Sequence, residues 1–315
     1  MKLTTPIEPV NFNFSATYNT RFVSIGSCFA ESMAGYLKSL KFKILSNPSG
    51  VVYNPISIAS HIENAIYRHS YTENDLNLAD GLYYSYDFHG IFSHHDKQEC
   101  LSLMNQRMAE SYDALSNCNI LLVTFGSSWV YTLNSTGKIV ANCHKQPATI
   151  FTRTRLQTAE IVDVWSSLIT QLSQLNPGIQ IVFTVSPVRH LRDGAHANNL
   201  SKAVLLLSAE ALCSKFANCH YFPSYEIILD ELRDYRFYAG DWVHPNQTAT
   251  DIIWERFANS VFTPETIRLT NEVENINKAL SHRVFNKNAA SYSKFEEYLK
   301  SEIDRINALI PGIEF

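Results

Sequence analysis

The chain has 315 residues, of which 45% are hydrophobic and 18% charged, a balance typical of globular proteins. Its formal net charge of −4 argues against a nucleic-acid partner, because phosphate binding needs a basic surface. We expect no membrane association either, since no apolar run approaches the roughly 20 residues of a spanning helix. The N-terminus lacks a signal-peptide pattern, and the six cysteines form no C-x-x-C pair. We therefore expect a cytoplasmic protein with reduced, mostly buried thiols.

Short apolar runs alternate with segments of helical periodicity from residue 21 to residue 257. The expected strands are 21–25, 42–45, 119–125, 181–185 and an edge strand at 220–222. The expected helices are 28–40, 56–67, 100–115, 161–175, 200–216 and 248–257. This alternation predicts an α/β fold, a doubly wound, three-layer parallel sheet with helices on both faces.

An aromatic- and histidine-rich insertion around residues 70–98 interrupts the pattern, and we expect it to contain a hairpin. Its aromatic residues largely alternate with polar ones, which favours a half-buried strand that lies near the site as a lid: Tyr83, Tyr84, Tyr86 and Phe88. A second group has no standard zinc spacing and is interpreted as a polar loop: His89, His94, His95 and Asp96. The sequence therefore predicts neither a metal site nor a cofactor.

Residues 263–315 differ from the rest in being polar, lysine- and glutamate-bearing and without strand signals. A modest apolar stripe at helical spacing needs a surface to cover it: Ile276, Leu280, Leu299, Ile303 and Ile306. We predict a core domain of residues 1–262 and a helical extension of residues 263–315 that packs outside the sheet.

Ser27 is the first candidate for chemistry, because it lies on the turn between the first strand and the first helix. Ligands of open α/β sheets bind at this carboxyl edge, and the free N–H groups of a helix start can stabilise an oxyanion. Ser27 is equally suited to cap the helix. The adjacent Cys28 is a rival nucleophile, since helix starts stabilise thiolates, although we expect its side chain to point into the core.

Asp241 and His244 form the second candidate, on a loop before the last core helix. A histidine three residues after an aspartate can place its imidazole against the carboxylate, which then selects the tautomer, as in a serine triad. The alternative is a helix-capping loop, because Pro245 and Asn246 are typical of a helix start.

Together these two segments carry a family resemblance. The stretch FVSIGSCFA at 22–30 resembles the signature of the GSCFA family, bacterial proteins grouped with the SGNH (GDSL-like) hydrolases. The stretch DWVHPN at 241–246 is similar to the last SGNH block. The resemblance covers most of residues 20–260, and it implies that Ser27 is the nucleophile, His244 the base and Asp241 its orienting carboxylate.

The remaining SGNH blocks match less closely. Gly50 stands where the family uses a glycine N–H in the oxyanion hole. The third block, Gly-x-Asn-Asp in the family, reads GSSW at 126–129, so that Ser128 replaces the asparagine. Asn142 and His144 are alternative oxyanion donors, and this departure affects the oxyanion hole more than the triad.

Other polar residues on the carboxyl edge are expected to bind substrate. Arg189 and His190, which follow the strand at 181–185, are the main candidates, with His144 as a third. An ordinary surface loop is the alternative. Lys202 is expected in the exposed first turn of a helix.

These features predict a serine esterase of small, acetyl-type acyl groups, and family analogy suggests O-acylated carbohydrate as substrate. The alternatives are an acyltransferase, which passes the acyl group to a second alcohol, and a non-catalytic binding module. The sequence leaves the oligomeric state open.

Overall fold

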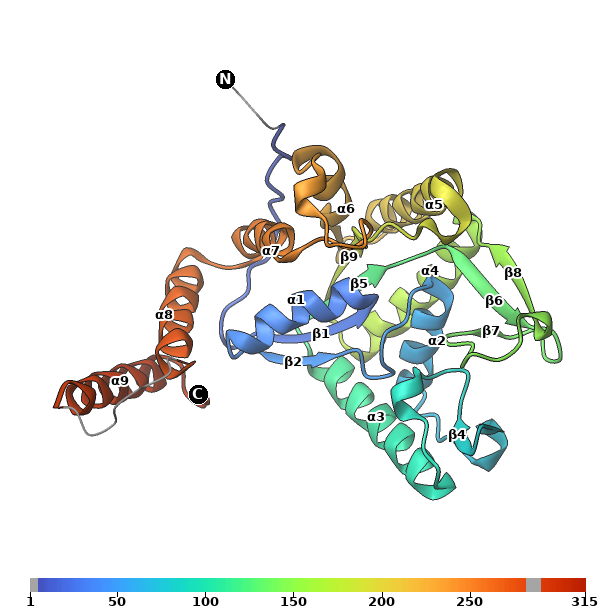
Figure 1. Ribbon diagram of the computed structural model, residues 1–315, viewed down its shortest axis with the longest axis horizontal. Helices are drawn as coiled ribbons and strands as arrows, with labels where there is room; N and C mark the ends of the chain where they lie inside the picture. Colours follow the sequence, from blue (N-terminus) through green and yellow to red (C-terminus); the bar gives the residue numbers. More distant parts are fainter. Residues whose placement is uncertain (1–4, 282–289) are drawn as a thin grey trace.

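The computed structural model describes residues 5–281 and 290–315 (Figure 1). At its centre is a five-stranded sheet in the order β10-β9-β5-β1-β2, and every neighbouring pair is parallel. The strands are β1 (Arg21–Gly26), β2 (Lys43–Ser46), β5 (Ile120–Phe125), β9 (Gln180–Val185) and β10 (Cys219–Tyr221). The predicted parallel α/β sheet is confirmed.

Helices cover both faces of this sheet. Phe22 and Leu122 pack on one face with α1 (Cys28–Ser39) and α7 (Gln247–Val261). Their neighbours Val23, Leu121 and Val123 belong to the core of the opposite face, because successive strand side chains point to opposite sides. The helices of that second face are α2 (Pro55–Ile66), α3 (Lys97–Asn117), α4 (Thr158–Leu175) and α5 (Gly194–Lys215).

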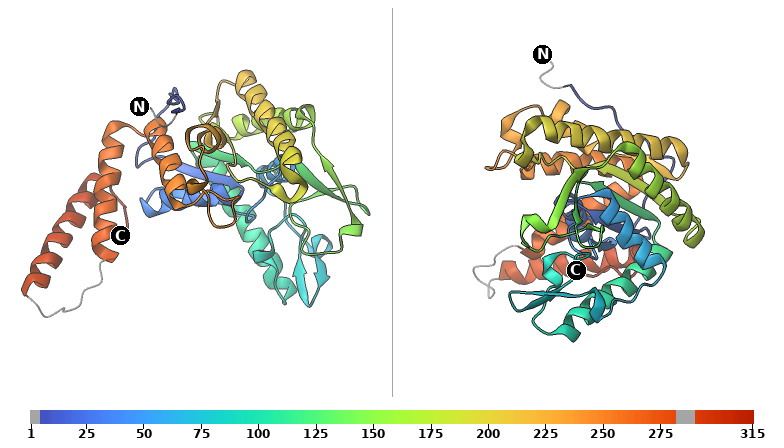
Figure 2. Two further views of the ribbon diagram at one scale, coloured as in Figure 1. Left: turned by 45° about the horizontal axis from the view of Figure 1, so that its top comes forward. Right: turned by 90° about the vertical axis from the view of Figure 1, so that its right-hand side faces the viewer.

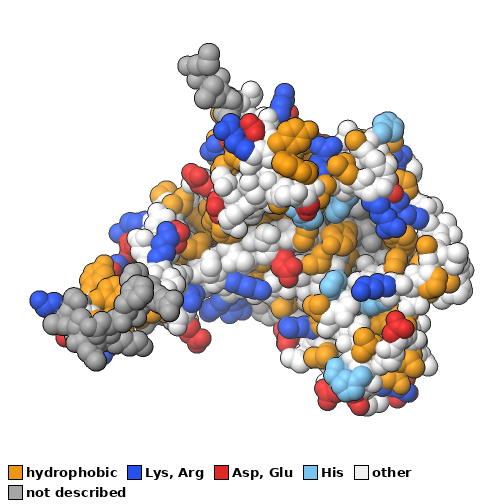
Figure 3. Space-filling model, viewed as in Figure 1, with side chains coloured by type: hydrophobic (Ala, Val, Ile, Leu, Met, Phe, Trp, Pro, Cys, Tyr) orange, Lys and Arg blue, Asp and Glu red, His pale blue; other side chains and the backbone are white. Residues whose placement is uncertain are grey.

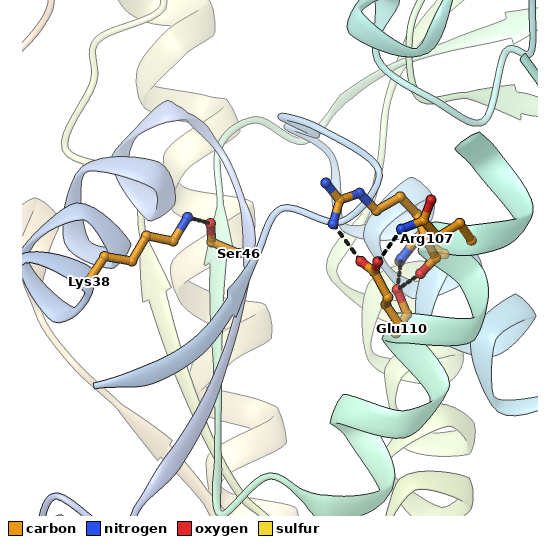
Figure 4. Close-up of polar contacts among 7 residues, drawn as sticks. Lys38, Ser46, Arg107 and Glu110 are labelled. Atoms are coloured by element: carbon orange, nitrogen blue, oxygen red, sulfur yellow. Dashed lines mark hydrogen bonds and ion pairs between the residues drawn. The ribbon is translucent and has the colours of Figure 1, made fainter. Parts of the chain in front are cut away.

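Polar contacts at the surface form both between neighbouring elements and within a helix (Figure 4). Lys38 Nζ, in the last turn of α1, lies 2.5 Å from Ser46 Oγ at the end of β2. On α3, Arg107 pairs with Glu110 one turn later. Exposed pairs of this kind contribute little to stability, so the buried sheet and its two cores hold the fold together.

The insertion contains the expected hairpin, β3 (Asn77–Ala79) and β4 (Leu82–Tyr84). A second, three-stranded antiparallel sheet was not predicted: β6 (Trp129–Leu133), β7 (Ile139–Val140) and β8 (Phe151–Arg155). Its signal lies in the aromatic and β-branched residues of WVYT and FTRTR, which are typical of strands. Because β6 starts soon after β5 ends, this small sheet adjoins the carboxyl edge of the main one.

The C-terminal segment forms the expected helices, α8 (Pro264–Ser281) and α9 (Ala290–Leu309), which extend away from the sheet (Figures 1 and 2). Their shared apolar cluster includes Val273 and Ile306, both fully buried. Two hydrogen bonds join α8 to the core: Thr266 Oγ1 donates to Ala16 O at 3.2 Å, and Asn277 Nδ2 to Ser39 O at 2.7 Å.

Short helical turns complete the connections: α6 (Ser224–Glu226), η1 (Glu73–Asp75), η2 (Gly90–Phe92), η3 (Ala148–Ile150), η4 (Leu191–Asp193), η5 (Ile227–Glu231) and η6 (Tyr235–Phe237). All six cysteines are free, as predicted, but only Cys100, Cys118 and Cys219 are buried. Within residues 5–281 and 290–315, no helix has the length and apolar character needed to cross a membrane. Acidic and basic side chains are interspersed over the face shown in Figure 3.

Candidate active site

Ser27 follows β1 directly and caps α1. Its Oγ accepts a hydrogen bond from the Phe29 N–H at 3.3 Å, and its side chain is 0% exposed. The preceding Gly26 has φ +144°, and a side chain there would collide with the Thr124 carbonyl of β5. The turn is therefore tightly built, and the capping role considered for Ser27 is present.

Cys28 is the first residue of α1 and is only half-buried, so the expectation that it points into the core is wrong. Burial raises the pKa of the thiol. The N–H groups of Phe29 and Cys28 and the positive charge of Lys202 act in the opposite direction. The net effect is a raised pKa, so Cys28 is protonated at neutral pH and needs a base to ionise it, although it lies in the field of a helix start and a lysine.

Asp241 and His244 are in direct contact. His244 Nδ1 lies 2.6 Å from Asp241 Oδ2, and Asp241 Oδ1 accepts from the N–H groups of Val243 and His244, each at 3.0 Å. These hydrogen bonds, those from the backbone first, lower the pKa of Asp241 to about 2. The carboxylate is therefore ionised at neutral pH and holds the imidazole through Nδ1. Within the described residues, His244 Nε2 has no hydrogen-bond partner.

The same loop also starts α7. Asn246 caps that helix by accepting from the Ala249 N–H at 3.0 Å, and the Ala239 N–H donates to His244 O at 2.8 Å. The capping interpretation and the dyad interpretation are therefore compatible, because different residues serve the two roles.

No hydrogen bond between described residues joins Ser27 Oγ to His244. The two segments are nevertheless neighbours, since Ser32 on α1 and Pro245, next to His244, line one surface pocket. Ser32 lies one turn after Cys28 and donates through Oγ to the Cys28 carbonyl at 3.3 Å. Residues four apart share a helix face, so the face of α1 that carries Cys28 turns toward the dyad loop.

Arg189 and His190, predicted to bind substrate, lie next to the dyad. The Arg189 N–H donates to Val243 O at 3.0 Å, which ties the loop after β9 to the dyad loop. The His190 ring packs edge-on against Tyr53 at 5.7 Å. Burial, with smaller contributions from Lys202 and His244, lowers the pKa of His190 to about 4, so this imidazole is neutral at pH 7.

Lys202 is 1% exposed, so the expectation that it lies in an exposed first turn is wrong. It projects from α5, and its Nζ donates to Gly126 O at 2.8 Å and to Ser186 O at 2.7 Å, just after β5 and β9. Burial lowers its pKa to about 7. The signal was present in the sequence, because Lys202 is in helical register with the buried Leu205, Ala209 and Leu212.

The groups proposed for the oxyanion hole are engaged elsewhere in the fold. The Gly50 N–H donates to Asn47 O at 2.7 Å, within a turn where Gly50 has φ +78° and lies against His89. Ser128 Oγ is buried and lies 3.1 Å from Ser201 Oγ. Neither group is joined to the dyad by a hydrogen bond within the described residues.

Asn142 and His144 belong to the insertion side of the molecule. Asn142 Oδ1 accepts from the His144 N–H at 2.8 Å. His144 Nε2 lies 2.9 Å from Ser85 O and 3.0 Å from Phe88 O, and its ring packs on Tyr84 at 4.3 Å. The His144 side chain therefore joins this loop to the segment after the hairpin, and Asn142 stabilises the turn that carries His144.

Asn47, which the sequence analysis did not single out, lies beside the β1–α1 turn. Its Oδ1 accepts from the Gly26 N–H at 2.9 Å. Its Nδ2 is buried and has no hydrogen-bond partner in the part of the chain that the structure describes. A buried amide donor without an acceptor is costly, which makes Asn47 a further polar group of interest at this turn.

The histidines of the insertion have local structural roles. His94 Nδ1 accepts from the Asp96 N–H at 3.0 Å, and Asp96 Oδ1 caps α3 by accepting from Glu99 N at 2.9 Å. Among the described residues, no group of three or more His, Cys, Asp or Glu side chains is placed to hold a metal ion.

A pocket of about 380 Å³ opens beside the dyad loop and is lined by Arg189, Tyr235, Tyr238 and Trp242, among others. The rings of Tyr235 and Trp242 stand edge-on at 5.9 Å and are 77% and 59% exposed. Trp242 has φ 60°, a left-handed conformation that is uncommon for a bulky residue. Exposed aromatic rings around an arginine are typical of a binding surface.

Two family models match the chain. The model of the GSCFA family matches residues 21–257, and that of the GSCFA domain protein C-terminal domain matches residues 273–315. No curated protein matches the chain. The first match contains the β1–α1 turn, the loop after β9 and the dyad, and the second contains the second half of α8 and all of α9.

Proposed function

The chain belongs to the GSCFA family, and for this member we propose nucleophilic acyl transfer from an ester to water, an esterase activity of the SGNH type. The observation that carries the proposal is the contact of 2.6 Å between His244 Nδ1 and Asp241 Oδ2. An ionised carboxylate on Nδ1 leaves Nε2 as the basic nitrogen, which is the arrangement that a general base of acyl transfer requires.

The proposed nucleophile comes from the β1–α1 turn, which offers the Ser27 hydroxyl and the Cys28 thiol. His244 accepts the proton of the nucleophile through Nε2 while the acyl carbon is attacked. The backbone N–H groups at the start of α1 stabilise the oxyanion. His244 then returns the proton to the leaving alcohol, and water hydrolyses the acyl-enzyme by the same route.

The SGNH assignment is supported by the topology. The helix after the first strand and the loop before the last core helix line one surface pocket, in a fold built on a five-stranded parallel sheet. Ligands of open parallel sheets bind at this edge. Gly50 and Ser128 do not support the SGNH assignment, because the Gly50 N–H and the Ser128 hydroxyl form hydrogen bonds with other residues of the fold.

For the substrate we propose a small, acetyl-type ester of a carbohydrate. The support is the pocket beside the dyad loop, whose exposed Tyr235 and Trp242 rings and Arg189 suit a ligand with both apolar faces and polar groups. A second candidate is transfer of the acyl group to another alcohol. The same open pocket supports this candidate, because an acceptor could occupy it beside the dyad.

Hydrolysis of p-nitrophenyl acetate tests the proposal. His244→Ala should abolish turnover, whereas His220→Ala should keep it, because His220 lies on the edge strand β10 and pairs with Gln180 at 2.9 Å. Equal rates for the two variants, or no turnover by the wild type, would favour the binding module. Adding glycerol or a sugar separates the two activities, since a transferase produces an acylated alcohol where an esterase releases acetate.

A further inference from the structure

We infer that Cys28, rather than Ser27, is the nucleophile, and that the acyl-enzyme is a thioester; this inference rests on the proposed function. The first argument is access. Ser27 is 0% exposed, and its hydroxyl accepts the Phe29 N–H that would otherwise be unsatisfied at the start of α1. Cys28 is half-buried, so part of this residue is open to solvent while the helix cap stays in place.

The second argument is direction. Cys28 and Ser32 share one face of α1, and Ser32 lines a pocket together with Pro245, the residue after His244. Because Cα–Cβ bonds of a helix tilt toward its N-terminus, the Cys28 side chain extends beyond Ser32 toward the carboxyl edge of the sheet. Tyr53, whose ring packs on His190, is itself within the electrostatic influence of Cys28.

The third argument is an independent one, the buried amino group of Lys202. Its Nζ donates hydrogen bonds to the carbonyls of Gly126 and Ser186, and no carboxylate within the described residues forms an ion pair with it. A buried ammonium without a counter-ion is costly unless an anion forms nearby. A charge on Cys28 would act on Lys202, so a thiolate that forms during catalysis would supply that anion.

The chemistry balances without any co-reactant except water. The Cys28 thiol gives its proton to His244 Nε2, and a bond forms between sulfur and the acyl carbon. The ester C–O bond breaks, and the leaving alcohol takes the proton from His244. Water, deprotonated by His244, then attacks the thioester carbon, and the C–S bond breaks to release the acid and restore the thiol.

Acyl trapping decides between the two nucleophiles. Wild-type enzyme mixed with p-nitrophenyl acetate and quenched in acid should carry one acetyl group on the peptide that contains residues 27 and 28. Neutral hydroxylamine should remove it, because thioesters react with hydroxylamine far faster than oxygen esters. An adduct on that peptide that resists hydroxylamine would overturn the inference and favour Ser27.

Variants provide the kinetic test. Cys28→Ala should lower kcat/KM at least 10²-fold, and Ser27→Ala should lower it much less. Cys143→Ala and Cys213→Ala, the other half-buried thiols, should match the wild type. An active Cys28→Ala combined with an inactive His244→Ala would overturn this inference alone. An active His244→Ala would instead overturn the proposed function.

A separate measurement tests whether the charge of Lys202 affects the ionisation of Cys28. The rate of Cys28 alkylation by iodoacetamide rises with pH as the thiol ionises. Lys202→Met should move the midpoint of this profile to higher pH, and Lys202→Arg should restore part of the shift. An unchanged midpoint in a folded Lys202→Met protein would show that the buried charge does not act on Cys28.

Discussion

Asp241 holds His244 at two points, with one carboxylate oxygen 2.6 Å from the ring Nδ1 and the other 3.0 Å from the backbone N–H of the same residue. The side chain and the backbone of His244 are therefore positioned by a single acid. Because the two residues are three apart on one loop, this contact is local and does not depend on distant packing.

The first prediction concerns this carboxylate. Asp241→Asn should lower kcat on the order of 10⁴-fold, since an amide no longer selects the tautomer or stabilises the imidazolium. Asp251→Asn is the matched control, because Asp251 lies nearby on α7 and accepts from Gln247 Nε2 at 2.9 Å. Steady-state rates for p-nitrophenyl acetate compare the two variants, and similar losses in both would argue against a special role for Asp241.

The second prediction concerns stability at the β1–α1 turn. Ser27→Ala removes the acceptor of the Phe29 N–H and should lower the free energy of unfolding by about 1 kcal/mol, the usual cost of losing a helix cap. Ser32→Ala, an exposed change on the same helix, should have a smaller effect. Urea denaturation followed by circular dichroism measures both, and an equal stability of the two variants would contradict the capping role.

The third prediction concerns the pH dependence of stability. Burial lowers the pKa of Lys202 to about 7, below its unfolded value of about 10.4. Between these values the unfolded chain binds more protons than the folded one, so the free energy of unfolding rises with pH in this window.

Lys202→Met removes this contribution. The stability of the wild type relative to Lys202→Met should therefore increase as the pH is raised from about 7 toward 10 and be constant below that window. Thermal or urea unfolding at several pH values gives the difference. A difference that does not change with pH would mean that Lys202 has an ordinary pKa in the folded protein.

The fourth prediction concerns the C-terminal helices. Ile306 is fully buried in the cluster between α8 and α9, so Ile306→Ala should cost about 2–5 kcal/mol of local stability. Leu309→Ala, at a position 52% exposed, should cost much less. For Ile306→Ala we expect faster amide hydrogen exchange in α8 and α9 only, and unchanged esterase rates. Loss of activity in a folded Ile306→Ala protein would show that these helices support the site.

The sequence by itself determined the features that depend on local patterns. The alternation of buried strands and periodic helices predicts the parallel sheet, because each element must bury one apolar face. The spacing of Asp241 and His244 predicts their contact, since three residues on one loop bring the side chains together. The SGNH assignment and the activity stay predictions, which the assays above test.

Only the tertiary structure decided which polar groups are free to act. Ser27 is closed off where β1, β5 and α1 meet, while Cys28, one residue later, stays half-exposed. Lys202 is buried with its Nζ hydrogen-bonded to the carbonyls of Gly126 and Ser186. These two residues lie 76 and 16 positions away in the sequence. Helical register indicates that Lys202 lies on the buried face of α5, but its acceptors come from distant segments, so only the folded structure shows them.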